Sequence, residues 1–389
     1  MKSSTTVVVT GLGLSTALSS NALTAWQKIR AGESAIALRQ PFLDLAPLPL
    51  AMSHKTPTRL ADIVEQVAKA AWQDAGLTLS RSKLADDCGV VVGSSRSYLR
   101  DWEAMVSQQN QGEAQVTGDW LKALPHGPAV SVAKIVGSAG PVLAPMADCA
   151  TGIWAITQAA DLIRSGRCQR VIAGAVESPI TPLTLAGFGK MGALAKTGCY
   201  PFDRQREGFV LGEGGALLVL ESAAVAAARG ARVYGQILAA GLSNDAHHVS
   251  SFAPSGGTGV RSLTSCLQRS ELAPYDIDAV HVHGTSTAQN DRMEANLIAQ
   301  ALGRQVPVMA TKGATGHTLG ASGAVTVALS LISLQQQALL PCVGLKMADF
   351  DLNFVRLGFD QALPKPLQNI LCFSFGFGGQ NAVIALRRN

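Results

Sequence analysis

Short apolar runs alternate with segments of helical periodicity along the chain. Several of these runs are typical of buried strands, at residues 7–9, 90–92 and 170–173. Helical spacing predicts helices over residues 22–31 and 59–75, which end at Gly32 and Gly76. Residues 40–58 are rich in proline and apolar side chains without a period, which predicts a surface connection. The alternation predicts an α/β protein with mostly parallel sheets covered by helices.

The same order of segments begins again near residue 235. Four weak echoes pair residues 7–12 with 237–242, 90–95 with 280–286, 149–152 with 320–323, and 171–174 with 370–373. Because all four occur in the same order, they predict two related βα halves. We expect the halves to cover residues 1–235 and 236–389.

A candidate nucleophile, Cys149, lies in the first half within Ala-Asp-Cys-Ala-Thr-Gly. Apolar residues follow at helical spacing from Ile153 to Ile163, so the thiol is expected at a helix N-terminus. Free N–H groups and the helix dipole favour negative charge there, and a thiolate is the reactive form of cysteine. The alternative is that Cys149 only packs in the core, as most free cysteines do.

Composition excludes several classes of protein. With 47% hydrophobic and 15% charged residues, the chain is a well-packed globular protein. A net charge of +5 is too mild and scattered for nucleic-acid binding, and it suits an acidic partner protein. Seven widely spaced cysteines without a CxxC pair argue against a disulfide framework and structural zinc. Neither a signal peptide nor a membrane span is expected, which predicts a cytoplasmic protein.

Three glycine-rich turns follow strand-like runs in the second half. They read His283-Gly-Thr-Ser-Thr, Lys312-Gly-Ala-Thr-Gly-His317 and Ser374-Phe-Gly-Phe-Gly-Gly. Turns of this kind lie at the carboxyl ends of strands, where sites form in open α/β sheets. A nucleophilic thiol, two histidines and exposed backbone N–H groups are the parts that acyl transfer needs. By contrast, Gly11-Leu-Gly13 lacks the third glycine of a dinucleotide-binding fingerprint.

With these motifs the chain resembles the β-ketoacyl-[acyl-carrier-protein] synthases of the elongating type. The matching segments run from residues 7–13 to Asn381 and include residues 202–203, 208–214, and Asp291 with Glu294. The resemblance implies the thiolase fold, a five-layer αβαβα architecture built from the two halves. It also implies decarboxylative Claisen condensation of malonyl-ACP with an acyl group held as a thioester on Cys149, in fatty-acid or polyketide/polyene-type chain elongation.

The resemblance further implies a role for each matching residue. Cys149 accepts the acyl group, and His283 and His317 hold the malonyl thioester carbonyl and favour loss of CO2. Lys312 has a structural and electrostatic role, and the Cys149 and Phe377 N–H groups form an oxyanion hole. The remaining matches are a gate formed by Phe377 with hinges at Gly376 and Gly378, a partner loop at residues 245–250, and pantetheine-binding hydroxyls of Thr285 and Thr287.

The expected partners follow from this chemistry. An acyl-carrier protein delivers substrate on its phosphopantetheine arm, and no permanently bound cofactor is implied. Lys55 and Arg59 are candidates for docking this acidic carrier. The family is dimeric, so a homodimer or a heterodimer with a paralogous subunit is expected. His281 shares a strand face with His283, but neither a carboxylate nor a cysteine completes a metal-ligand set with them.

Departures from the family pattern suggest a specialised member. Asp148 precedes the nucleophile where alanine is usual, and an inward carboxylate there would oppose thiolate formation. Trp154 replaces a generally smaller residue or histidine, and Gln380 replaces a threonine. Thr326 replaces a glutamate, which removes a charge partner from Lys312. The alternative function is a partner subunit of a heterodimeric ketosynthase, resembling a chain-length factor, with little activity of its own.

Competing enzyme classes are disfavoured by particular positions. A degradative thiolase needs a second cysteine in its last glycine-rich loop, and residues 374–379 contain none. An initiating synthase primed by coenzyme A would carry asparagine in place of His317.

Overall fold

The computed structural model describes residues 5–79, 87–111, 118–251, 257–358 and 365–389. Its strands are β1 (Val7–Thr16), β2 (Ile36–Arg39), β3 (Leu48–Ala51), β4 (Cys88–Gly93), β5 (Val142–Leu143), β6 (Arg170–Glu177), β7 (Gly214–Ser222), β8 (Gly235–Asn244), β9 (Ala279–His281), β10 (Val308–Met309), β11 (Asn369–Gly376) and β12 (Gln380–Arg387). Its helices are α1 (Ala22–Arg30), α2 (Leu60–Asp74), α3 (Leu99–Asn110), α4 (Gly127–Val136), α5 (Thr151–Arg164), α6 (Pro182–Lys190), α7 (Ala223–Ala228), α8 (Gly257–Arg269), α9 (Ala288–Ala301), α10 (Lys312–Thr315) and α11 (Ser322–Gln336). The helices predicted over residues 22–31 and 59–75 are confirmed as α1 and α2.

Within the described residues, ten strands form one sheet in the order β10-β9-β11-β12-β8-β1-β7-β6-β4-β5. The N-terminal set, β1-β7-β6-β4-β5, matches the C-terminal set, β8-β12-β11-β9-β10, position by position. In each set the first two pairings are antiparallel and the last two are parallel. The expectation of mostly parallel sheets is therefore wrong, because β7 and β12 each run against both of their neighbours.

The two sets of strands meet where β1 pairs with β8 over residues 7–9. The repeated order of strands supports a division of the chain at this junction. We propose that residues 1–235 and 236–389 are two related halves, with the boundary at the start of β8.

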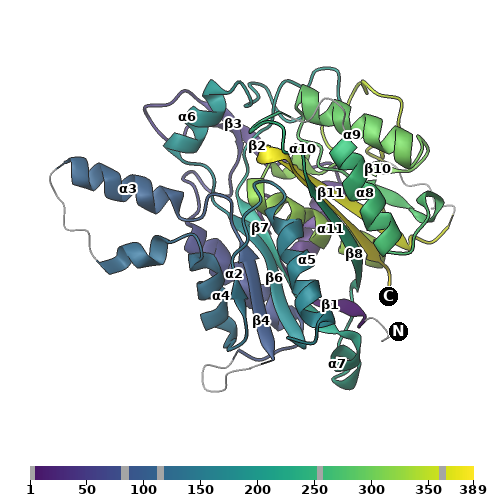
Figure 1. The fold of residues 1–389 in the computed structure, drawn as a ribbon. Helices are drawn as coiled ribbons and strands as arrows, with labels where there is room; N and C mark the ends of the chain where they lie inside the picture. Colours follow the sequence, from purple (N-terminus) through teal and green to yellow (C-terminus); the bar gives the residue numbers. More distant parts are fainter. Residues whose placement is uncertain (1–4, 80–86, 112–117, 252–256, 359–364) are drawn as a thin grey trace.

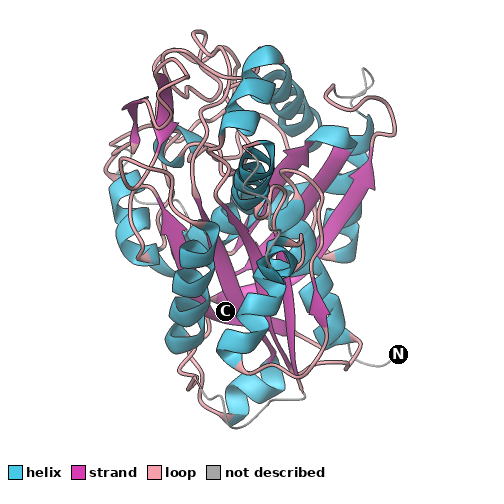
Figure 2. Cartoon of the chain, turned by 90° about the vertical axis from the view of Figure 1, so that its left-hand side faces the viewer, coloured by secondary structure: helices cyan, strands magenta, loops and turns pink. Residues whose placement is uncertain are grey.

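The helices lie in three layers around the two sets of strands. α5 and α11 pack against each other and contact strands of both sets, so they form the central layer. α2 and α4 cover the outer face of the N-terminal set, and α8 covers the C-terminal set with α9 beside it (Figure 1). Figure 2 shows this arrangement from the side, with helices on both faces of the strands. The predicted five-layer αβαβα architecture is confirmed.

The central layer belongs to an apolar core that joins the halves. One cluster of buried side chains includes Ile153 of α5, Leu331 of α11 and Ile370 of β11. Because these side chains come from both sides of residue 235, each half completes the core of the other.

Two sequence expectations near the N-terminus are wrong. β1 does not turn at Gly11 but continues to Thr16, and the glycines let α2 approach it closely. A Cβ at Gly11 would lie 2.3 Å from the Ala71 carbonyl oxygen, and one at Gly13 would lie 2.0 Å from that of Val67. The connection over residues 40–58 also contains β3, which pairs with β2 and is mostly buried.

One described segment, Leu319–Gln336, has the length and apolar composition of a membrane span, contrary to the expectation from sequence. It consists of a short 3₁₀ turn and α11, and 89% of it is buried inside the fold. Its apolar character is explained by its place in the central layer, where side chains meet protein on all sides.

Candidate active site

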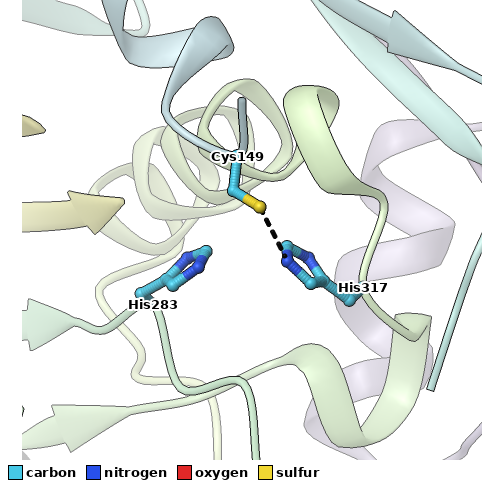
Figure 3. Close-up of side chains that lie close together, drawn as sticks. All are labelled: Cys149, His283 and His317. Carbon is cyan, nitrogen blue, oxygen red and sulfur yellow. Dashed lines mark hydrogen bonds between the residues drawn. The ribbon is translucent and has the colours of Figure 1, made fainter. Parts of the chain in front are cut away.

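Three side chains that are distant in sequence converge at one end of the central layer. Cys149 lies just before α5, His283 follows β9, and His317 follows α10. Cys149 Sγ lies 3.2 Å from His317 Nε2, and the two imidazole rings are 5.2 Å apart between centroids (Figure 3). All three side chains are buried, with 2–5% of their surface exposed.

The three side chains open onto a cavity of about 390 Å³. The lining also includes the predicted pantetheine-binding and gating residues Thr285, Thr287, Gly376 and Phe377. The Thr285 and Thr287 hydroxyl oxygens are 2.9 Å apart, so one donates to the other. A volume of this size lies within the range of small-ligand pockets, so a thioester arm can be placed against Cys149.

Cys149 is held as a thiol. Burial raises its pKa to about 12, and the Asp148 carboxylate acts in the same direction, while Lys312 and Arg96 oppose them. The expectation that the helix N-terminus would favour the thiolate is therefore outweighed by burial. Asp148 itself is half-buried, has a left-handed backbone (φ 45°), and its pKa is raised by burial.

His317 is neutral, and both of its ring nitrogens form hydrogen bonds. Burial lowers its pKa well below the ordinary value, and Lys312 acts in the same direction. Its Nδ1 lies 2.8 Å from the Ser322 hydroxyl, which opens α11 and was not singled out in the sequence. A hydroxyl both donates and accepts, so Ser322 is compatible with either tautomer of His317.

His283 is neutral for similar reasons. Burial lowers its pKa, with Lys312 and His317 adding to the effect. The Lys312 ammonium lies 3.3 Å from His283 Nδ1 and donates to the His283 carbonyl oxygen. A cation beside Nδ1 requires a lone pair there, which leaves the proton on Nε2, facing away from Lys312.

A buried carboxylate, Glu294, supports the turn that carries His283. Glu294 of α9 accepts bonds from the His283 and Gly284 N–H groups, both at 2.6 Å, and its charge opposes the lowering of the Lys312 pKa by burial. Asp291 accepts from the Phe202 N–H in the same network. In the sequence analysis Asp291 and Glu294 match the family but have no assigned role. Their i, i+3 spacing, shortly after the His283 turn, was the feature that could have indicated a shared role.

The glycine loop after β11 packs directly on the nucleophile. A Cβ at Gly376 would lie 3.0 Å from the Cys149 backbone nitrogen. Gly378 has φ 69° and donates its N–H to the Val249 carbonyl at 2.8 Å. This contact joins the glycine loop to residues 245–250, the loop predicted to be its partner.

Other singled-out residues lie away from the reacting atoms. His281 is a packed strand residue, as predicted, with its nitrogens 2.9 Å from Ser330 Oγ and 3.0 Å from Thr311 Oγ1. Trp154 packs against the central core and does not line the cavity. Lys55 and Arg59 do not line it either: Arg59 binds Asp62 at the start of α2, in a separate polar depression. Docking by these two residues stays a prediction.

The exclusion of a metal from sequence used an argument that the structure overturns. Cys149 lies close enough to His283 to form a possible metal-ligand set, because the ligand atoms of Cys149, His283 and His317 lie within 4.8 Å of one another. The Lys312 ammonium beside His283 disfavours a second cation at the same place. The absence of a resident metal therefore stays a prediction on electrostatic grounds.

Similarity to known proteins agrees with this geometry. Residues 57–226 match the family described as beta-ketoacyl synthase, N-terminal domain, and residues 234–346 match its C-terminal domain. The chain is 33% identical to 3-oxoacyl-[acyl-carrier-protein] synthase 2 of Mycobacterium tuberculosis, over 98% of this chain and 97% of the relative. It is 30% identical to the synthase 2 of Staphylococcus aureus, over 98% of each.

Solved structures share the fold over the full length. A chain of the AntDE:AntF complex, a type II PKS acyl-carrier protein with its ketosynthase bound to the hexaketide, superposes with a TM-score of 0.91 at 26% identity, covering 100% of both chains. A beta-ketoacyl synthase from Burkholderia phymatum superposes with a TM-score of 0.88 at 26% identity, over 99% of this chain and 100% of that one. The chain therefore belongs to the beta-ketoacyl synthase family.

Proposed function

We propose that this chain catalyses the decarboxylative condensation of malonyl-ACP with an acyl group held on Cys149, giving a β-ketoacyl-ACP. The observation that carries the proposal is the 3.2 Å contact between Cys149 Sγ and His317 Nε2, with His283 facing the same cavity. A thiol paired with a neutral imidazole, beside a second imidazole donor, suits both acyl transfer and carbanion formation.

In the first step Cys149 takes the acyl group. His317 Nε2 accepts the thiol proton as the sulfur attacks the carrier thioester carbonyl, and Nδ1–H donates to Ser322 in this tautomer. The tetrahedral oxyanion is held by the N–H groups of Cys149 and Phe377. When it collapses, the carrier thiolate leaves and takes the proton back from His317.

In the second step malonyl-ACP occupies the cavity. The Nε2–H groups of His283 and His317 donate to the malonyl thioester carbonyl, the Ser322 hydroxyl now donating to His317 Nδ1. As CO2 leaves, its bonding electrons form an enolate that these two donors stabilise. The enolate carbon attacks the acyl-Cys149 carbonyl, and the Cys149 thiolate is expelled as the new C–C bond forms. A proton from solvent then restores the Cys149 thiol.

The partner in this function is an acyl-carrier protein that brings its phosphopantetheine arm into the cavity beside Thr285 and Thr287. We propose a cytoplasmic enzyme that acts as a homodimer or with a paralogous subunit. The second candidate is a subunit resembling a chain-length factor. It is favoured by the rise in the Cys149 pKa next to Asp148, and by a TM-score of 0.90 at 25% identity to a chain of the ishigamide ketosynthase/chain length factor.

Intact mass after mixing with acyl-carrier proteins tests the proposal. We expect an acyl-sized mass gain in the parent and none in Cys149→Ala, and a β-ketoacyl product when malonyl carrier is added. If no acyl carrier modifies Cys149, the chain-length-factor alternative is favoured, and co-purification with a paralogue is the next measurement.

A further inference from the structure

The turn after β4 directs an arginine toward the apolar wall behind the nucleophile. Arg96 follows Ser94 and Ser95, and the two serine hydroxyls and the Arg96 N–H all donate to the buried carboxylate of Glu177. Gly320, three residues after His317, packs on the same carboxylate: a Cβ there would lie 2.6 Å from Glu177 Oε1. The base of the Arg96 side chain is therefore held rigidly relative to His317.

The Arg96 guanidinium covers the aromatic side chain next to the gate. Its Cζ lies 5.3 Å from the centroid of the Phe188 ring. Phe188 in turn lies 6.0 Å from Phe377 and 5.1 Å from Phe209, between ring centroids. These rings belong to the apolar cluster that contains Cys149. Phe377 and Phe209 line the cavity, whereas Phe188 and Arg96 do not.

The Arg96 guanidinium has N–H donors that are not used in hydrogen bonds to the described part of the chain. Among the described residues, no ion pair or hydrogen bond engages its guanidinium, although the side chain is half-buried. Arg96 acts electrostatically on Asp148, whose half-buried carboxylate lies beside the glycine loop: Asp148 Oδ2 would be 3.7 Å from a Cβ at Gly378. A cation and a carboxylate therefore both lie near Phe377, and together they carry no net charge.

We propose that Arg96, with Asp148, selects acyl groups that carry a neutral oxygen, such as a hydroxyl, a few carbons from the thioester. The proposal rests on the proposed function, because the acyl chain on Cys149 must pass Phe377 to reach Phe188. A hydroxyl would accept from the guanidinium and donate to the carboxylate. A plain alkyl chain would displace water from both half-buried groups and leave them without partners, which is costly. A carboxylate would be repelled by Asp148.

The test compares the rates at which pantetheine thioesters acylate Cys149, followed by intact mass. The thioesters are hexanoyl, 6-hydroxyhexanoyl and adipoyl, and the proteins are the parent, Arg96→Met, Arg96→Lys and the control Lys190→Met. Lys190 is an exposed cation on the same helix as Phe188. We expect the parent to favour the hydroxyacyl over the hexanoyl group about tenfold, the lower end for one hydrogen bond to a charged group. Arg96→Met should reduce this ratio to one or below, and Lys190→Met should keep it.

Each outcome bears on a different statement. If no thioester acylates the parent, the proposed function fails. If the parent is acylated but Arg96→Met has the same ratio as the parent, the selection by Arg96 is refuted. A preference of the parent for hexanoyl or adipoyl refutes it too. Should Arg96→Met fail to fold, Arg96→Lys keeps the charge but loses the planar stack on Phe188, and an unchanged ratio in that variant would equally overturn the proposal.

Discussion

Cys149 combines a reactive position with an environment that suppresses its charge. Burial and Asp148 both raise its pKa, and the helix that begins at Thr151 does not reverse this. Reactivity must then come from proton transfer to His317 at the moment of attack. Of burial and the Asp148 carboxylate, the carboxylate is the cause that a single substitution can remove.

We predict that Asp148→Asn speeds alkylation of Cys149 by iodoacetamide about threefold at pH 8, equivalent to half a pKa unit. Because the thiol pKa is raised to about 12, the thiolate fraction, and with it the rate, should rise through pH 7 to 9 in both proteins without a plateau. Peptide mass spectrometry separates Cys149 from the other buried thiols, and Asp161→Asn on the exposed side of α5 is the control. A plateau in the parent below pH 9 would indicate a preformed thiolate.

Ser322 is predicted to position His317. Ser322→Ala should slow acylation of Cys149 about tenfold, because the ring loses the hydroxyl that serves both tautomers. Ser322→Thr keeps a hydroxyl and should recover most of the rate. Ser333→Ala, which removes the partner of the Trp26 indole on the same helix, should lower stability but leave the acylation rate unchanged. Equal rates in Ser322→Ala and the parent would remove Ser322 from the mechanism.

At the scale of elements, the contact between β1 and α2 depends on glycine. A Cβ at Gly13 would lie 2.0 Å from the Val67 carbonyl oxygen, so Gly13→Ala must push α2 away from the sheet. We expect a loss of about 3 kcal/mol in the free energy of urea unfolding. Gly187→Ala is the matched control: no atom lies within 4 Å of its Cβ, and a gain of up to about 1 kcal/mol is expected in α6. A loss below about 1 kcal/mol for Gly13→Ala would contradict this account.

The α9 carboxylate is predicted to stabilise the buried Lys312. Glu294→Gln keeps the side-chain size but removes its charge, and should cost about 3 kcal/mol in urea unfolding. Glu65→Gln breaks an exposed pair with Lys69 on α2 and should cost no more than about 0.5 kcal/mol. Equal effects of the two substitutions would mean that Glu294 is held as the neutral acid.

At the scale of the whole molecule, the shared core predicts that the halves unfold together. All five tryptophans lie between residues 26 and 154, so their fluorescence reports the N-terminal half. Pulse labelling of Cys266, Cys342 and Cys372, all buried, reports the C-terminal half. The two urea midpoints should coincide, because α5 and α11 pack against strands of both sets. Separate midpoints would show that each half has its own stable core.

Local patterns were sufficient for part of this structure. Helical periodicity predicted α1 and α2 within two residues, because an amphipathic segment carries its own signal. The motifs around Cys149, His283 and His317 indicated the family through residue types and spacings that acyl-transfer chemistry needs. These properties depend on neighbours in sequence, so the sequence by itself determined them.

Other features arose only from contacts between distant segments. The 3.2 Å bond between Cys149 and His317 joins residues 168 positions apart, and the antiparallel course of β7 and β12 depends on strand pairing that periodicity does not encode. The direction of the Cys149 pKa, the partnership of Glu294 with Lys312, and the stacking of Arg96 on Phe188 likewise depend on burial and through-space charge. The tertiary structure decided these properties, because solvent exclusion and electrostatic distance exist only once the chain is folded.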